Sequence, residues 1–157
     1  MRAKVIVIGQ SPSRNGSGGP LEGACGRRLA EAAGISMSTY LSRTTRMNLL
    51  DEWPGPSFPQ HRAREAAREM YIDLTGGRRV IFLGLQVSAA FGVIMPILEW
   101  KRVTFWVERG VVMATPAEPW RSNAVECAIV PHPSGLNRWW NDEANRRAAA
   151  RFLKVLR

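Results

Sequence analysis

His132 is the side chain in this sequence best suited to chemistry. It is one of only two histidines and lies between Pro131 and Pro133, which restrict the backbone on both sides. An imidazole held in this way can donate a hydrogen bond to an oxygen that gains negative charge during a reaction. A surface histidine, or a core histidine with satisfied hydrogen bonds, is the alternative that this segment leaves open.

Two loops are expected to meet beside this histidine. Val5–Ile8 and Cys127–Val130 are continuous apolar runs, which predict strands buried on both faces of a parallel sheet. Gly9–Ser13 follows the first run and Pro131–Arg138 follows the second. Because ligands of parallel sheets bind beyond the carboxyl ends of the strands, both loops should lie at one edge. The glycines of the first loop lack the spacing of a dinucleotide-binding or phosphate-binding loop and also fit a plain connection.

The remaining patterns predict an α/β fold. Leu21–Ala33 has helical spacing and ends at Gly34, so a strand, a loop and a helix begin a βαβ unit. A second strand is predicted at 39–41 or, alternatively, at 45–50. Residues 1–157 are expected to form one domain, a three-layer sandwich around a central, mostly parallel, four-stranded sheet. The other expected elements are helices over 62–74 and 86–91, a strand over 80–84, and a hairpin of 104–107 with 111–114. A terminal helix is also expected, with Asn141 as its cap and with Ala148, Phe152, Leu153 and Leu156 on its buried face.

The charge and hydropathy of the chain indicate which kind of partner it would bind. The 157 residues include 22 Lys and Arg against 13 Asp and Glu, which gives a net charge of +9. This excess favours a polyanionic partner, although an arginine-rich proteome would produce the same balance, and the arginines at 62, 64 and 68 also fit a solvated helix face. No apolar run reaches the length of a membrane span and no cleavage site follows Met1. We therefore expect a cytoplasmic protein that does not contact membranes.

The cysteines exclude one class of metal site. Cys25 and Cys127 are the only two, and neither belongs to a C-x-x-C pair. An iron–sulfur cluster or a four-cysteine zinc site cannot be assembled from them. We expect chemistry without a metal or another cofactor.

The two loops carry a resemblance that covers nearly the whole chain. Gly9-Gln10-Ser11-Pro12-Ser13 and His132-Pro133-Ser134-Gly135-Leu136 resemble the two motifs of the uracil-DNA glycosylase superfamily, in the right order and near the two ends. The segment from Gly19 to Leu29 is similar to the loop and helix entry of its compact bacterial and archaeal branches, and Arg79–Gly84 is similar to its third strand unit. The resemblance implies a uracil-DNA glycosylase-like fold and a monomeric, cluster-free protein that acts on DNA.

The resemblance also assigns catalytic groups. Cleavage of an N-glycosidic bond leaves negative charge on the departing pyrimidine, and His132 matches the donor that superfamily members direct at O2 of that base. Asn48 matches the asparagine that reads the flipped base, since an amide can both donate and accept, while a turn asparagine is the alternative. Ser11 stands where many members carry an aspartate or asparagine that positions the attacking water, and Gln10 replaces the glutamate of the cluster-containing branch. They are expected to hold the attacking water and contact the base without serving as a carboxylate base.

A base pocket follows from the same comparison. Ser13 occupies the place where uracil-specific members have a bulky tyrosine that blocks substituents at C5 of the pyrimidine. With Pro12 and Asn48, it is expected to line a pocket that admits a 5-substituted pyrimidine at least as well as uracil. Asp51 and Glu52 follow closely in sequence, and either is a further candidate to orient a water.

A DNA-binding segment is predicted beyond the histidine. Leu136 matches the apolar wedge that enters the duplex when the base is flipped. Trp139 and Trp140 either stack on DNA or pack the final helix, and the sequence leaves both alternatives open. The residues expected to contact phosphates or neighbouring DNA are Ser134, Gly135, Asn137 and Arg138.

The sequence therefore predicts a monofunctional DNA glycosylase that flips a deaminated or 5-modified pyrimidine out of DNA and hydrolyses its N-glycosidic bond. Two alternatives keep the fold. One is a transferase that tailors hypermodified pyrimidines in DNA, which the loss of the usual acid at position 11 favours. The other is a non-catalytic DNA-binding module, for which an arginine-rich surface suffices.

Overall fold

A single β-sheet organises the structure. The computed structural model describes residues 4–16, 18–75 and 78–157. The strands are β1 (Val5–Gly9), β2 (Thr44–Asn48), β3 (Arg79–Leu83), β4 (Lys101–Glu108), β5 (Val111–Pro116) and β6 (Val125–Val130). They lie in the order β2-β1-β3-β6-β4-β5, and the first four of that order run parallel. The predicted α/β class with a mostly parallel sheet is confirmed.

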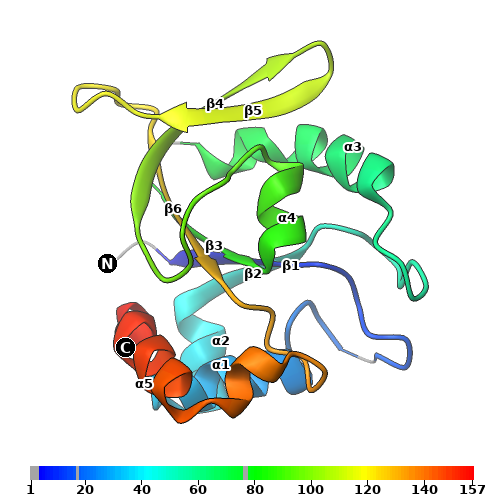
Figure 1. The fold of residues 1–157 in the computed structure, drawn as a ribbon, viewed down its shortest axis with the longest axis vertical. Helices are drawn as coiled ribbons and strands as arrows, with labels where there is room; N and C mark the ends of the chain where they lie inside the picture. The colour runs from blue at the N-terminus through cyan, green and yellow to red at the C-terminus, as the bar shows by residue number, and fades with distance from the viewer. Residues whose placement is uncertain (1–3, 17, 76–77) are drawn as a thin grey trace.

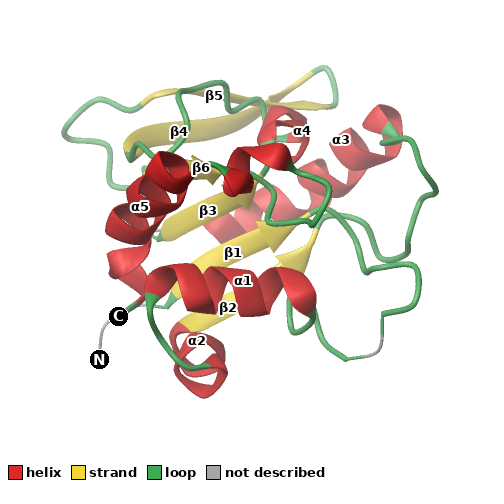
Figure 2. Cartoon of the chain, turned by 60° about the horizontal axis from the view of Figure 1, so that its bottom comes forward, coloured by secondary structure: helices red, strands yellow, loops and turns green. Residues whose placement is uncertain are grey.

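Helices cover both faces of this sheet. They are α1 (Ala24–Ala33), α2 (Met37–Arg43), α3 (Gln60–Met70), α4 (Leu85–Ala90) and α5 (Glu143–Phe152), with 3₁₀ turns over Tyr71–Leu74, Arg138–Asn141 and Leu153–Leu156. Helices α1, α2 and α5 pack on one face, and α3 and α4 pack on the other (Figure 1; Figure 2). No helix in the described ranges is long and apolar enough to cross a membrane.

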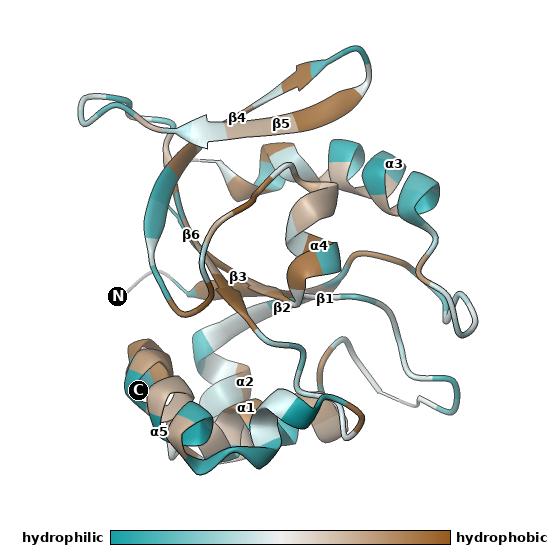
Figure 3. Ribbon diagram, viewed as in Figure 1, coloured by the Kyte–Doolittle hydropathy of each residue, from teal (hydrophilic) through white to brown (hydrophobic). Residues whose placement is uncertain are grey.

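The parallel strands β1, β3 and β6 are buried on both faces because each of their side chains faces one of the two helix layers. In β1, Ile6 and Ile8 pack with α3 and α4, whereas Val5 and Val7 pack with α1 and α5. Figure 3 shows hydrophobic residues in the central strands, and hydrophilic residues interspersed with hydrophobic ones in α3 and α5. This two-sided burial explains why β1, β3 and β6 are continuous apolar runs in the sequence.

The prediction of four strands is wrong, because the predicted hairpin joins the main sheet. Strand β4 begins at Lys101, three residues before the predicted start, and these first residues pair antiparallel with β6. The register sets Lys101 opposite Cys127 and Val103 opposite Val125. The hairpin of β4 with β5 was predicted correctly, but its attachment depends on a pairing between distant segments that local sequence patterns do not reveal.

The predicted strand at 39–41 is wrong, and the alternative at 45–50 is close to the observed β2. Residues 39–41 lie within α2, because Ser36 caps that helix by accepting a hydrogen bond from the backbone N–H of Thr39 at 3.1 Å. Gly34 ends α1 just before it in a left-handed conformation with φ of 67°. Two capping residues thus override the strand preference of Thr39 and Tyr40.

Two helix ends also differ from the prediction. Helix α1 begins at Ala24 rather than at Leu21, whose φ of 56° is not helical. Asp142, not Asn141, caps α5 by accepting from the backbone N–H of Asn145 at 3.0 Å. In this helix and the turn after it, Ala149, Leu153 and Leu156 are buried, whereas the predicted Ala148 and Phe152 are only partly buried.

Arg46 ties the edge strand β2 to the helix before it. Its Nη1 donates to the carbonyl oxygens of Leu41 at 2.9 Å and Thr44 at 3.0 Å, and to Oγ1 of Thr44 at 3.2 Å. Its Nη2 lies 3.6 Å from a carboxylate oxygen of Glu22, and its guanidinium stacks over the ring of Tyr40. Because Asn48 is two residues along the same strand, this network also positions a predicted site residue.

Replacing Arg46 with alanine should lower the free energy of unfolding by about 2 kcal/mol, because charge-assisted hydrogen bonds to partly buried acceptors are lost. Urea denaturation followed by circular dichroism measures the change. Arg43→Ala is the matched control, because Arg43 is an exposed arginine of α2, and it should cost less than about 1 kcal/mol. Equal losses in the two variants would contradict the assignment.

Candidate functional site

The four parallel strands end at one level along an edge of the sheet. Gly9 of β1 pairs with Asn48 of β2, and Leu83 of β3 pairs with Val130 of β6. The hydrogen bonding continues past the strands, since the N–H of Gly84 donates to the carbonyl of Val130 at 2.8 Å. The loops after β1, β2, β3 and β6 therefore open on the same side of the molecule.

A pocket of about 340 Å³ opens at this edge beside His132. Gln10 from the loop after β1, Gln86 from α4 and His132 from the loop after β6 line it with polar side chains. Ile97 and Trp139 contribute apolar walls. Ligand pockets in proteins begin at about this size, roughly 300 Å³. The structure thus brings Gln10 and His132 together, as expected from the positions of their loops.

Side chains from later in the chain hold the backbone of His132. Nδ2 of Asn137 donates to the His132 carbonyl at 3.0 Å, and Nε1 of Trp140 donates to the carbonyls of Pro131 and His132, both at 3.2 Å. Oδ1 of Asn137 accepts from the N–H of Trp139 at 3.1 Å. The Asn137 amide is thus engaged inside the loop, and the DNA contact predicted for it would have to replace these bonds.

The two tryptophans have different surroundings. Trp140 is only 8% exposed and packs in the core with α5, which favours the packing alternative for this residue. Trp139 is partly buried, meets Trp140 edge to face with ring centroids 5.0 Å apart, and lines the pocket beside His132. A wall of that pocket is therefore an aromatic ring supported by the core.

Burial sets the protonation state of His132. It lowers the pKa of the imidazole from its ordinary value of 6.5, because the partly buried site disfavours the charged form. At neutral pH the ring is uncharged and has one N–H donor and one acceptor nitrogen. A neutral donor at a fixed position is suited to stabilise an oxygen that gains charge.

Asn48 lies at the other end of the row of strand ends. Strands in a sheet are about 4.8 Å apart, so three spacings place the ends of β2 and β6 about 14 Å from one another. Oδ1 of Asn48 is buried and has no hydrogen-bond partner among the described residues. Asn48 does not line the pocket beside His132. Between the two residues lie Gly9, which is buried at the end of β1, and Gly84, where an added Cβ would lie 3.4 Å from Cβ of His132.

Leu21, which the sequence patterns place only at the start of a helix, lies against Gly9 at the end of β1. Its Cδ2 lies 2.7 Å from the position that a Cβ at Gly9 would take, and Oδ1 of Asn48 lies 3.2 Å from the same position. The carbonyl of Leu21 in turn packs against Gly26, where an added Cβ would collide with it. A glycine within a helix is costly unless another backbone approaches closely, so Gly26 was the available signal.

The residues predicted to line a base pocket follow Gln10 along the first loop. Ser11 and Pro12 are partly buried, and Ser13 is exposed. None of the three lines the pocket beside His132. Farther along this loop, the guanidinium of Arg14 stacks over the ring of Trp53 at 5.4 Å, which links the loops after β1 and β2. The space that Ser13 would leave beside a pyrimidine stays a prediction.

The second loop ends in an exposed apolar tip. Leu136 is 94% exposed, in a turn closed by the N–H of Asn137, which donates to the carbonyl of Ser134 at 3.2 Å. Gly135 and Arg138 are also exposed, and Ser134 is partly buried. A single exposed leucine is common on protein surfaces, so the wedge role of Leu136 stays a prediction.

Positive charge is concentrated on the side of the sheet that carries this loop. Residues 131–157, which include the loop and α5, contain six Lys and Arg against two Asp and Glu. Residues 49–75, which include α3, contain three arginines against five acids. The net charge of the molecule is therefore unevenly distributed between the two helix layers, and the α5 layer is the better match for a polyanion.

Other reactive groups of the described ranges lie outside this arrangement. Asp51 is exposed, and Glu52 pairs with Nη2 of Arg62 at 3.1 Å. Burial raises the pKa of the thiols of Cys25 and Cys127, so both are protonated at neutral pH. Within the described residues, no three or more His, Cys, Asp or Glu side chains gather where they could hold a metal ion.

The environment of His132 predicts a pH dependence of stability. Because the folded state disfavours the imidazolium, the unfolded chain takes up a proton first as the pH falls below about 6.5, and the free energy of unfolding decreases. Urea denaturation at about pH 7.5 and 5.5 should show a smaller decrease for His132→Gln than for the native protein. An identical decrease in both proteins would contradict the burial of this ring.

No protein-family model matches this chain, and no curated protein matches it. The comparisons therefore assign neither a family nor an activity. Inferences about function rest on the residues at the edge of the sheet and on the resemblance of the two motifs that contribute them.

Proposed function

We propose that the protein is a DNA glycosylase that flips a deaminated or 5-modified pyrimidine out of DNA and hydrolyses its N-glycosidic bond. One observation carries the proposal. A neutral, backbone-anchored His132 faces a pocket shared with Gln10, and the same loop exposes Leu136 a few residues later. A donor for the leaving base and a wedge for the DNA stack thus come from one rigid segment.

The fold we propose is that of the uracil-DNA glycosylase superfamily. The two motifs that resemble it follow β1 and β6, which are separated by β3 in the parallel part of the sheet. The segment similar to its third strand unit is β3, followed directly by α4. The agreement between motif order, strand order and a common sheet edge supports this assignment.

In the proposed reaction, water adds to C1′ of the sugar as the bond from C1′ to the pyrimidine nitrogen breaks. The bonding electrons leave with the base, and the N–H of His132 donates to its O2 as negative charge develops there. The proton lost by the water finally neutralises the base anion. A neutral donor suits this step, because it stabilises the anion without a prior protonation.

Gln10 and Ser11 are the groups that we propose hold the attacking water. Both belong to the loop after β1, and Gln10 shares the pocket with His132. The N–H of Leu50 donates to the Gln10 carbonyl at 2.9 Å, so the backbone at this position is fixed. An amide and a hydroxyl can orient a water but cannot remove its proton as a carboxylate does, and we expect slow turnover.

Asn48 and Leu21 are the groups that we propose contact the flipped base. The buried Oδ1 of Asn48 lacks a partner among the described residues, and an N–H of a pyrimidine would satisfy it. Leu21 would provide an apolar surface beside the base, over Gly9. The exposed Ser13 leaves room for a substituent at C5, which is why 5-modified pyrimidines are included as substrates.

The activity assay uses duplexes that contain uracil, 5-hydroxymethyluracil or 5-hydroxymethylcytosine, with alkali-labile abasic sites as the readout. We expect release of at least one of these bases, and His132→Ala should slow it at least about 100-fold, as expected for loss of an oxyanion donor. His61→Ala is the control, because His61 is the other histidine and lies exposed on α3.

Product mass spectrometry separates the alternatives. A transferase would leave a modified base attached to the DNA, and a binding module would leave the DNA unchanged. No base release from any of the three duplexes, with equal DNA binding by His132→Ala and the native protein, would overturn the proposed function.

Leu136 should matter for duplex substrates in particular. Leu136→Ala should slow base release from a duplex about tenfold, because the gap left by the flipped base is no longer filled, and should affect the same single strand much less. Ile94→Ala is the control, because Ile94 is 92% exposed and lies in the loop after α4. Equal slowing on single-stranded and duplex DNA would contradict the wedge role.

A further inference from the structure

We propose that Arg28 is a positioning residue that couples a DNA phosphate to the placement of His132. The inference rests on the proposed glycosylase function and adds a residue outside both motifs. Arg28 lies on α1, about a hundred positions before the loop that it contacts. Its role follows from how that loop is held, from where the guanidinium lies and from the charge that surrounds it.

The backbone of the His132 loop is held through its carbonyl oxygens. Pro131 and Pro133 have no N–H to donate, so few backbone hydrogen bonds are available to this segment. Trp140 donates to the carbonyl of Pro131, and Trp140 and Asn137 both donate to the carbonyl of His132. Three successive carbonyls, at 131, 132 and 133, accept from side chains, and Arg28 supplies the third contact.

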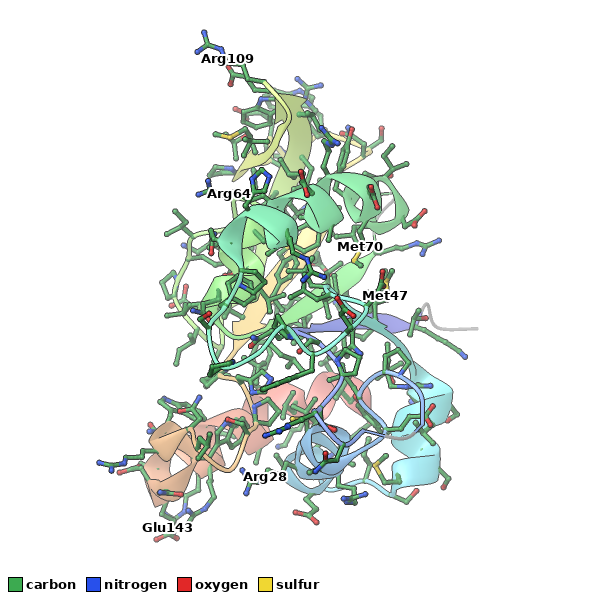
Figure 4. The ribbon with its side chains drawn as sticks, turned by 90° about the vertical axis from the view of Figure 1, so that its right-hand side faces the viewer. Arg28, Met47, Arg64, Met70, Arg109 and Glu143 are labelled. Atoms are coloured by element: carbon green, nitrogen blue, oxygen red, sulfur yellow. The ribbon has the colours of Figure 1, made fainter. Side chains whose placement is uncertain are left out.

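The guanidinium of Arg28 lies along this loop. Its Nη1 donates to the carbonyl of Pro133 at 3.4 Å, a long hydrogen bond that has room to shorten. Its Nη2 lies 3.5 Å from the position that a Cβ at Gly135 would take. Figure 4 shows Arg28 between α1 and the segment that leads to α5. The glycine at 135 keeps this edge of the guanidinium free of an adjacent side chain.

The charge of Arg28 is available to an anion. Within the described part of the chain, no carboxylate lies within ion-pair distance of it, whereas Glu22, at the start of the same layer, pairs with Arg46. Arg28 is exposed, and its guanidinium has five N–H donors of which the Pro133 carbonyl uses one. The fork geometry of arginine allows the remaining donors to bind phosphate oxygens at the same time.

A phosphate beside Leu136 would therefore act on His132 through Arg28. Binding the phosphate orders the guanidinium, and the ordered guanidinium holds the carbonyl of Pro133, one residue after His132. The donor would then be held most firmly when DNA is in place. This coupling predicts an effect on the chemical step that exceeds the effect of one lost phosphate contact.

The test compares Arg28→Ala with Arg27→Ala, which removes an adjacent exposed arginine of α1. The substrate is a short duplex with one uracil or 5-hydroxymethyluracil, whichever the native protein cleaves. At saturating protein, Arg28→Ala should slow single-turnover base release about tenfold, whereas Arg27→Ala should leave it within about twofold. Arg28→Ala should also lower the slope of log affinity against log salt by about one, as for one phosphate contact.

Arg28→Lys separates charge from geometry. Lysine should restore the salt slope but only part of the rate, because a point charge does not match two acceptors as the planar fork does. Equal rates for Arg28→Ala and Arg27→Ala, with base release by the native protein intact, would overturn the coupling and leave the proposed function standing. Full recovery of the rate by Arg28→Lys would mean that the positive charge alone accounts for the effect of Arg28, and it would also overturn the coupling.

The DNA-free protein supplies a readout that does not depend on glycosylase activity. Side-chain nitrogen signals of His132 in NMR spectra should shift in Arg28→Ala and stay unchanged in Arg27→Ala. If the native protein releases no base from any duplex, the proposed function fails, while these spectra still test the contact. Unchanged His132 signals in Arg28→Ala would overturn the positioning role.

Discussion

The level ends of four parallel strands are the constraint on which the rest of this structure depends. The register of β2, β1, β3 and β6 brings Asn48, Gly9, Leu83 and Val130 to one line, and hydrogen bonds such as that from Gly84 to Val130 extend the order into the loops. Parallel strands require crossovers, so segments far apart in sequence must meet at this edge. The loops after β1 and β6 become neighbours for that reason, and Gln10 and His132 from these loops line one pocket.

Rigidity at this edge comes from side chains that bind backbone carbonyls. In the His132 loop, proline removes amide donors, and Trp140 and Asn137 supply the missing bonds. A donor that is fixed before the substrate arrives needs no reorganisation when charge develops, which is the basis of electrostatic preorganisation. Oδ1 of Asn48 is the opposite case, because it is a buried polar atom without a partner among the described residues, and a ligand that donated to it would relieve the cost.

The structure also shows where the excess of positive charge lies. Taken as a composition, the excess of positive charge favours any polyanion as a partner. In residues 49–75 the acids offset the arginines of α3, whereas residues 131–157 keep a positive net charge. The basic layer is the one that carries the exposed Leu136. Charge attracts DNA without regard to its sequence, while a wedge and a pocket act on one nucleotide. The proposed wedge and the pocket beside His132 lie on the same side of the sheet as this positive charge, as the proposed function requires.

The sequence by itself determined the local elements and their order. Apolar runs marked β1, β3 and β6, a helical pattern marked most of α3, and two prolines marked the backbone at His132 as restricted. These signals are local, since each depends on residues within a few positions of each other. Only the tertiary structure decided that β4 adds to β6, that Leu21 covers Gly9, and that Trp140 and Arg28 hold the His132 loop. Those contacts join segments that the sheet brings together, and no pattern of spacing along the chain encodes which distant side chain will fill a given position.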